Sequence, residues 1–114
     1  MPLVPIPYVH VGIGALLTIV SLPLCFKLVP KNNFYGIRIP KAFISDANWY
    51  AINCFGGVVL TLGGLFLMLF GYLTWDSAPS PNDPMAVIDM VAPLPVLALA
   101  IVIILVYART LPEK

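Results

Sequence analysis

Three long runs of apolar residues, separated by two shorter polar stretches, dominate the pattern of this chain. A helix needs about 20 mainly apolar residues to cross the hydrocarbon core of a membrane. The three runs predict helices over about residues 8–27, 45–75 and 84–108. They leave an ordered first loop over about 28–49 and a second loop over about 76–83. The sequence therefore predicts a single all-α integral membrane domain with three transmembrane helices.

The third run contains signals for a helix start and for a break. Asp83 suits the N-cap position, and Pro84 suits the first helical position, where its missing N–H would have no partner in any case. Pro93 and Pro95 then remove two backbone donors inside the helix. We expect a kink there, and two carbonyl groups one turn earlier that a neighbouring helix or water must satisfy.

Small residues repeat along one face of each of the first two helices, at an average spacing of about 3.5 residues, which favours a left-handed crossing. In lipid, close approach across small residues supplies much of the packing between helices. We expect the two seams to face each other within one chain; the alternative is that one seam mediates self-association. The seams consist of Gly14, Thr18 and Ser21 in the first helix and Gly57, Thr61, Gly64 and Gly71 in the second.

Charge is scarce and unevenly placed. Charged residues make up 10% of the chain and the net charge is +1, which argues against nucleic acid as a partner. The first loop carries Lys31, Arg38 and Lys41, and Arg109 follows the third helix, whereas the second loop has no Lys or Arg. The positive-inside rule then predicts a plasma-membrane protein with its N-terminus outside and its first loop and C-terminus in the cytoplasm. Trp75 is expected at the outer membrane interface.

The sequence offers few parts for chemistry. It contains no Gly-rich phosphate loop, no nucleophile–base pair and no paired carboxylates, so we expect neither an enzyme nor a bound cofactor. His10 is the only histidine, too few for a haem or zinc site, and we interpret it as an interfacial residue with its hydrogen bonds satisfied. Asp89 is the one acid inside a predicted span and a possible functional acid of the outer face. We expect no basic residue at its depth to pair with it.

The first loop contains the most informative pattern. Gly36 permits a turn that other residues resist, and Arg38 and Lys41 suit contacts with lipid phosphates. Ser45 is the expected N-cap of the second helix, and Trp49 is an expected anchor at the membrane interface. The alternative is a loop that serves only as a positive-inside anchor.

Eleven positions of this stretch follow one another in a distinctive order and spacing: Pro30, Asn32, Tyr35, Gly36, Arg38, Pro40, Lys41, Ser45, Trp49, Tyr50 and Asn53. In this pattern the chain resembles the SdpI family of bacterial membrane proteins, named for an immunity protein against a secreted killing peptide. The resemblance departs at Cys54, where the family usually has Arg, and the chain resembles a short form that carries three helices alone.

The resemblance implies a non-enzymatic membrane protein that confers immunity or relays a signal. Its first loop would dock a protein partner or lipid headgroups through Asn32, Tyr35, Gly36, Arg38, Pro40, Lys41, Trp49 and Asn53. Beside the lipid bilayer itself, a protein partner or a homo-oligomer is therefore expected. The alternative function is that of a structural accessory subunit in a larger membrane protein complex.

Overall fold

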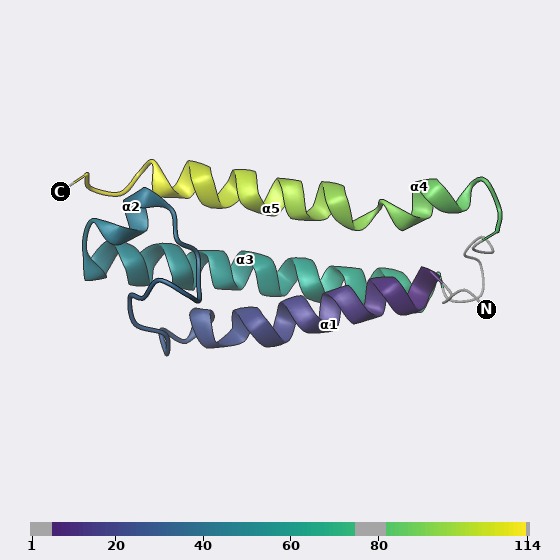
Figure 1. Ribbon diagram of the computed structural model, residues 1–114, viewed down its shortest axis with the longest axis horizontal. Coiled ribbons are helices and arrows are strands. Elements are labelled where there is room, and N and C mark those ends of the chain that lie inside the picture. The colour runs from purple at the N-terminus through teal and green to yellow at the C-terminus, as the bar shows by residue number, and fades with distance from the viewer. Residues whose placement is uncertain (1–5, 75–81, 114) are drawn as a thin grey trace.

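The computed structural model describes residues 6–74 and 82–113 (Figure 1). Three spans are long and apolar enough to cross a membrane, which confirms the predicted all-α fold with three transmembrane helices. Trp75 and residues 76–81 of the predicted second loop lie outside the described residues. The helices in chain order are α1 (Ile6–Cys25), α2 (Pro40–Phe43), α3 (Asp46–Leu73), α4 (Ala86–Met90) and α5 (Pro93–Ala108).

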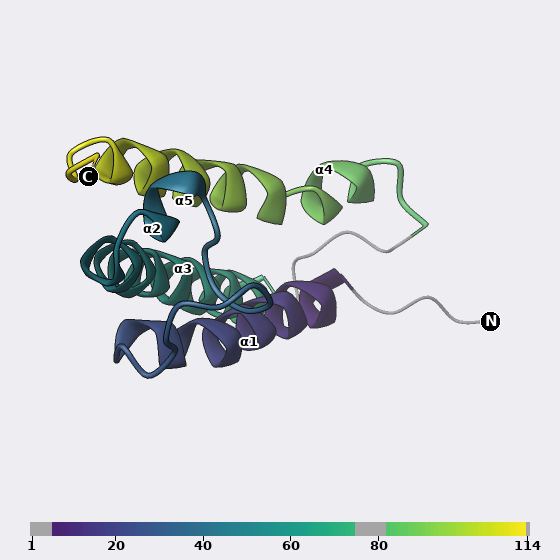
Figure 2. The same ribbon diagram turned by 60° about the vertical axis from the view of Figure 1, so that its left-hand side comes forward.

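The molecule is a rod in which α3 is the central element. Its extents are 52 × 24 × 23 Å, and α3 alone, with 28 residues, is about 42 Å long. Figures 1 and 2 both show α1 on one side of α3 and α5 on the other, with the short α2 beside the start of α3. Since α3 is longer than the hydrocarbon core of about 30 Å, it reaches into at least one headgroup layer or crosses with a tilt.

The start of α3 is set by Ser45, as the sequence indicates. Ser45 has an extended backbone, and its hydroxyl oxygen accepts a hydrogen bond of 3.0 Å from the backbone N–H of Asn48. Asp46 follows in the first turn, where a negative charge is favourable beside the positive helix end. The cap therefore separates the first loop from a helix that continues without interruption to Leu73.

The interface between α1 and α3 is built on backbone contact at the predicted seams. A Cβ atom added to Gly14 would lie 2.4 Å from the carbonyl oxygen of Gly64, and one added to Gly64 would lie 2.6 Å from the hydroxyl oxygen of Thr18. At one end of the interface Gly57 faces the backbone of Ser21 and Cys25. Near that end the Thr61 hydroxyl contacts the Cys25 sulfur at 3.5 Å, and at the other end Gly71 faces the carbonyl oxygen of Pro7. The structure thus places the two seams against each other within one chain.

The third span is divided into α4 and α5 by a break at Val91 and Ala92. Pro93 and Pro95 leave the carbonyls of Asp89 and Val91 without their usual partners, but Ala92 N–H donates to Asp89 at 3.2 Å and Leu94 N–H donates to Val91 at 2.9 Å. The expectation that a neighbouring helix or water must satisfy these carbonyls is therefore wrong. The chain satisfies them itself by tightening to bonds between residues three apart.

The beginning of the third span also differs from the prediction. Asp83 does accept a backbone hydrogen bond, from Met85 N–H at 2.9 Å, and its carbonyl accepts from Ala86 N–H at 2.9 Å. These bonds form a turn, so the helix proper begins at Ala86 rather than at Pro84. The Asp83 side chain therefore caps this turn and is not the N-cap of a continuous helix.

The contact between α3 and α5 is looser than that between α1 and α3. An apolar cavity of about 500 Å³ opens between the two helices, lined by residues that include Val59 and Phe66 of α3 and Val96 and Leu99 of α5. Gly63 faces this side, and a Cβ atom added there would be at an ordinary distance of 3.5 Å from Val96. The fold is therefore a tight α1–α3 hairpin with a third span attached by side chains.

The end of α1 contains a strained residue. Lys27 has φ 58°, in the left-handed region, and the helix closes with Lys27 N–H bonded to Leu24 and Leu28 N–H bonded to Pro23. This is the Schellman pattern, in which the residue at the position of Lys27 is usually glycine.

We expect Lys27→Gly to raise the free energy of unfolding by about 1 kcal/mol, because glycine adopts this conformation without a Cβ clash. The measurement is a denaturation titration in mild detergent. Lys27→Ala is the matched control: it removes the same charge but keeps the Cβ atom. An equal gain in both variants would show that charge, not backbone conformation, is responsible.

Candidate functional site

The loop between α1 and α3 is held in one shape by side-chain amides. The carboxamide oxygen of Asn32 accepts hydrogen bonds from the N–H groups of Phe34, at 2.8 Å, and Tyr35, at 2.7 Å. Its nitrogen donates to the carbonyls of Pro30 and Tyr35. One side chain thus closes the turn from both directions, which is the role for which Asn is favoured in turns. The Tyr35 hydroxyl donates to the Val20 carbonyl and fixes the turn to α1.

Gly36 is required at the next position. Its φ is +117°, which L side chains rarely adopt. A Cβ atom added there would lie 2.8 Å from the side-chain oxygen of Asn53 and 3.1 Å from the Trp49 ring. Glycine therefore allows the loop to pass directly over two residues of α3.

Asn53 binds the backbone of the loop from inside α3. Its side chain is 2% exposed, and its oxygen accepts from Ile37 N–H at 2.6 Å. Its nitrogen donates to the carbonyl of Ile37 at 3.3 Å and to that of Trp49 at 3.0 Å. The side-chain amide of Asn53 thus bonds both the N–H and the C=O group of Ile37, as the backbone of a neighbouring strand would in a sheet.

Trp49 lies beneath the loop and is not exposed on the surface of the rod. It is fully buried, and its indole N–H donates to the Val29 carbonyl at 2.9 Å, while its ring packs against Phe43 at 5.5 Å between centroids. The prediction of an interfacial anchor is therefore wrong for Trp49. The loop covers the ring, so the indole donor finds a protein partner instead of a lipid headgroup.

Asn48 of α3 also holds this loop in place, a role that the sequence pattern did not predict. It is 3% exposed, and its nitrogen donates to the carbonyls of Lys41, at 3.1 Å, and Pro112, at 2.8 Å. It therefore ties the chain after α5 to the loop. The available signal was its spacing: Asn48, Ile52 and Gly56 follow at intervals of four and lie on one buried face.

Basic side chains lie on the outside of this framework. Arg38 is exposed and donates to the Asn33 carbonyl, and Lys31 forms a solvent-exposed ion pair with Asp46 at 3.5 Å, which contributes little to stability. Pro40 is exposed at the first position of α2, and Lys41 next to it is half-buried. Four of the eight predicted binding residues thus shape the loop: Asn32, Gly36, Trp49 and Asn53. The other four are exposed or partly exposed on its outside: Tyr35, Arg38, Pro40 and Lys41.

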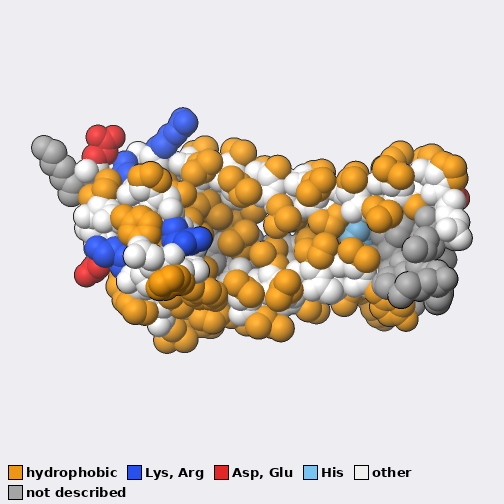
Figure 3. All heavy atoms as spheres, in the orientation of Figure 1, with side chains coloured by type: hydrophobic (Ala, Val, Ile, Leu, Met, Phe, Trp, Pro, Cys, Tyr) orange, Lys and Arg blue, Asp and Glu red, His pale blue; other side chains and the backbone are white. Residues whose placement is uncertain are grey.

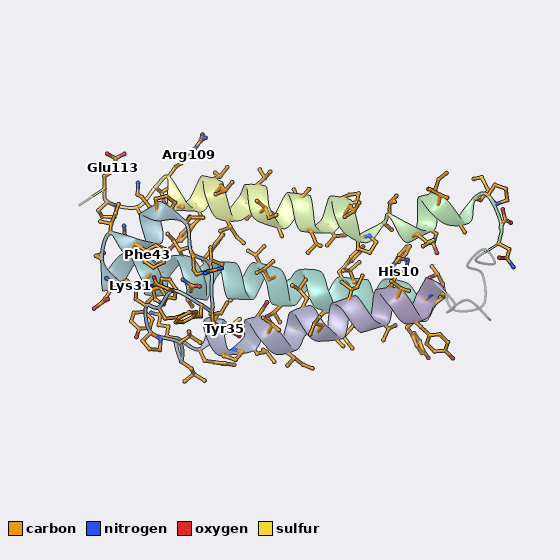
Figure 4. All side chains as sticks on the ribbon, in the orientation of Figure 1. His10, Lys31, Tyr35, Phe43, Arg109 and Glu113 are labelled. Carbon is orange, nitrogen blue, oxygen red and sulfur yellow. The ribbon has the colours of Figure 1, made fainter. Side chains whose placement is uncertain are left out.

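All five Lys and Arg residues in the described ranges belong to this end of the rod: Lys27, Lys31, Arg38, Lys41 and Arg109. Figure 4 shows Lys31, Tyr35 and Phe43 at the end that also holds Arg109, with His10 towards the other end. Figure 3 shows the blue side chains gathered there, and mostly hydrophobic spheres along the rest of that face. No group of three or more His, Cys, Asp and Glu side chains that could hold a metal occurs within residues 6–74 and 82–113.

Asp89 lies towards the opposite end of the rod and is paired. Its side chain is 15% exposed, and one carboxylate oxygen is 3.7 Å from Nε2 of the buried His10. The expectation that no basic residue lies at its depth is therefore wrong. The expectation that His10 has its hydrogen bonds satisfied is also wrong, since neither ring nitrogen has a hydrogen-bond partner among the described residues. The break in the third span turns α4 so that Asp89 meets α1, which no local pattern indicates.

Comparison with known proteins gives one finding that bears on this geometry. The family described as the SdpI/YfhL protein family matches residues 28–108, more than two thirds of the chain. The match begins within the loop described above and runs through α3 and α4 to the end of α5. No curated protein and no solved structure matches the chain. The chain belongs to the SdpI/YfhL protein family, as the loop pattern indicates.

Proposed function

We propose that this chain is a non-enzymatic membrane protein of the immunity or signalling type, and that its basic end docks a protein partner. One observation carries the proposal: a loop whose backbone is fixed from inside presents cationic and aromatic side chains outward. Phe34 is 90% exposed at the tip of the turn closed by Asn32, and Arg38 is exposed four residues later.

Protein recognition explains the rigid framework better than lipid binding does. Attraction to anionic lipid needs only charge and contributes about 1 kcal/mol for each basic residue near the surface. A fixed backbone adds nothing to that attraction, whereas it lowers the entropy lost when a protein surface is bound. Aromatic residues and Arg, the types exposed at Phe34 and Arg38, are also enriched at protein interfaces.

The same asymmetry supports an orientation for the chain. Because the Lys and Arg residues of the described ranges lie at the end formed by the loop and the last turn of α5, the positive-inside rule favours a cytoplasmic position for this end. The partner would then be a cytoplasmic protein, or the cytoplasmic part of a membrane protein.

A photo-crosslinking amino acid in place of Phe34 tests the proposal in the native membrane. We expect a protein adduct at position 34, and none at position 72, where Tyr72 is 74% exposed at the far end of α3. The double change Arg38→Gln and Lys41→Gln should reduce the adduct several-fold. Arg109→Gln is the matched control, since Arg109 is an exposed cation at the same end outside the loop.

Two results would contradict docking through the loop: adducts with lipid alone, or a protein adduct that the double change leaves intact. Isolation of the protein in mild detergent distinguishes the proposed function from the alternative of an accessory subunit. Recovery of the chain in fixed stoichiometry within a large assembly would make it an accessory subunit rather than an immunity or signalling protein.

A further inference from the structure

The cavity between α3 and α5, hereafter the α3–α5 groove, lies in the middle of the membrane-spanning part of the molecule. Its volume is about 500 Å³, and all of its lining side chains are apolar. Val59 lies near the centre of the span Asp46–Leu73, and Val96 lies near the centre of the span Ala86–Ala108. In a hydrocarbon core of about 30 Å, the middle of a span is about 15 Å from either headgroup layer. The medium around the groove is therefore hydrocarbon.

Small residues give the groove its depth. Gly63 of α3 and Ala100 of α5 both line it, while Leu62 and Leu99 form its exposed rims. In the seam between α1 and α3, the backbone of the opposite helix fills the space beside each glycine. A Cβ atom added to Gly63 would meet only Val96 within 4 Å, at 3.5 Å. The protein itself therefore does not use the room that Gly63 leaves.

Two stacked aromatic rings bridge α3 and α5 at the end of the groove that faces the loop. Phe55 lies four residues before Val59, and Tyr107 lies four residues after Ile103, so each shares the helix face of a groove residue. Their rings are nearly parallel, with 4.0 Å between centroids and an interplanar angle of 16°. A molecule therefore enters the groove from its open side rather than lengthwise from the headgroup layer near the loop.

The groove is too narrow for a helix. Its lining residues on α5 run from Pro95 to Ile103, about 12 Å at the helical rise, so its volume gives a mean cross-section of about 40 Å². A helix with its side chains has a diameter of about 10–12 Å and thus a cross-section of about 80 Å² or more. An unbranched hydrocarbon chain has no side groups and enters such a space. Its entry is favourable, because the atoms that line an empty space lack dispersion contacts.

We propose that the α3–α5 groove binds the end of an acyl chain of a membrane phospholipid. The groove lies at the depth that chain ends reach, and its apolar lining offers a hydrocarbon chain dispersion contacts along its length. The chain fills the room beside Gly63 and completes the packing between α3 and α5. The attachment of α5 to the hairpin of α1 and α3 therefore depends on lipid, independently of what docks at the loop.

A phosphatidylcholine with a diazirine at the end of one acyl chain tests this site in lipid nanodiscs. After irradiation, mass spectrometry compares the adducts at Leu62 and Leu99, which are 61% and 62% exposed, with those at Leu16, which is 64% exposed. Leu16 is on α1, on the opposite side of α3 from α5 (Figures 1 and 2). It lies between two residues that would contact a Cβ atom at Gly64, so Leu16 and Leu62 match in type, exposure and depth.

We expect several-fold more adducts at Leu62 and Leu99 than at Leu16, because a chain held in the groove stays beside the first two. Equal labelling would overturn the proposal, since lipid would then contact the groove as it contacts any exposed face. Fewer adducts at Leu62 and Leu99 would overturn it as well, because a protein such as a second copy of this chain would then cover the groove.

A second test fills the groove from the protein side. Gly63→Leu places its Cβ atom at an ordinary distance and the rest of its side chain in the groove, whereas Gly12→Leu adds the same side chain in open space. Phospholipid added to the delipidated protein in detergent should raise the Tm of the unchanged protein and of Gly12→Leu by several degrees. It should raise that of Gly63→Leu by less. An equal rise in all three would contradict the packing role of the chain. The comparison of leucines uses the unchanged protein, so it decides the proposal whether or not Gly63→Leu folds.

Discussion

Gly14→Ala and Gly64→Ala are each expected to force α1 and α3 apart and to lower the free energy of unfolding by about 1–3 kcal/mol, the usual range for overpacking. Besides side chains, a new methyl group would meet backbone atoms: the Gly64 carbonyl oxygen at 2.4 Å for Gly14, and the Gly14 carbonyl oxygen at 2.7 Å for Gly64. A side chain could rotate away from the clash, but a helix backbone has to move as a whole. A denaturation titration in mild detergent measures the loss.

Neighbouring glycines supply matched controls on the same helices. Gly12→Ala places its methyl group in open space, and Gly63→Ala places it 3.5 Å from Val96, an ordinary van der Waals distance. Both changes should leave stability unchanged or raise it slightly, because alanine favours a helix more than glycine does. If Gly12→Ala and Gly14→Ala had the same effect, close backbone approach would not be what holds α1 to α3.

Asn53→Ala is expected to release the loop from α3, with a loss of about 2–4 kcal/mol. It leaves the N–H and C=O groups of Ile37 without their partner in a partly buried site, where each unsatisfied group costs about 1–2 kcal/mol, the lower part of the range for buried groups. Hydrogen–deuterium exchange at Ile37 should accelerate at least tenfold, while exchange in the middle of α3 stays slow. The crosslink at position 34 should weaken too, since it depends on the shape of the loop.

Asn33→Ala is the control for this change, because Asn33 is an exposed asparagine of the same loop. We expect its unfolding free energy and its exchange rates to match those of the unchanged protein. Slow exchange at Ile37 in Asn53→Ala would mean that Trp49 and Gly36 hold the loop without the amide.

Features set by short-range patterns could be predicted from the sequence. Spans follow from length and hydropathy, the α3 cap follows from Ser45 before a polar first turn, and the seam follows from small residues at helical spacing. The loop was also recognisable, since the Gly36 position and the order of its polar residues match a family pattern. In each case the physical cause lies within one element or in the repeat of one residue type.

Features that depend on how distant segments meet could not be predicted. The contact of His10 with Asp89 requires the direction in which α4 leaves the break, and a helical wheel for a continuous third span does not give it. Trp49 looked like a membrane anchor because its partner, the Val29 carbonyl, comes from the other side of the loop. The role of Asn48 depends on the position of Pro112, because the chain after α5 passes close enough for the Pro112 carbonyl to accept from the Asn48 side chain.

The unequal attachment of the two outer helices has a consequence for biosynthesis. The first two spans emerge from the ribosome before the third, and their seam contains nearly all of the close backbone contact described above. The contacts of that seam involve residues of α1 and α3 alone. The carbonyls freed at the break in the third span are satisfied within that span. The hairpin of α1 and α3 is therefore expected to assemble in the membrane while the ribosome is still at work, with α5 joining last along a surface already formed.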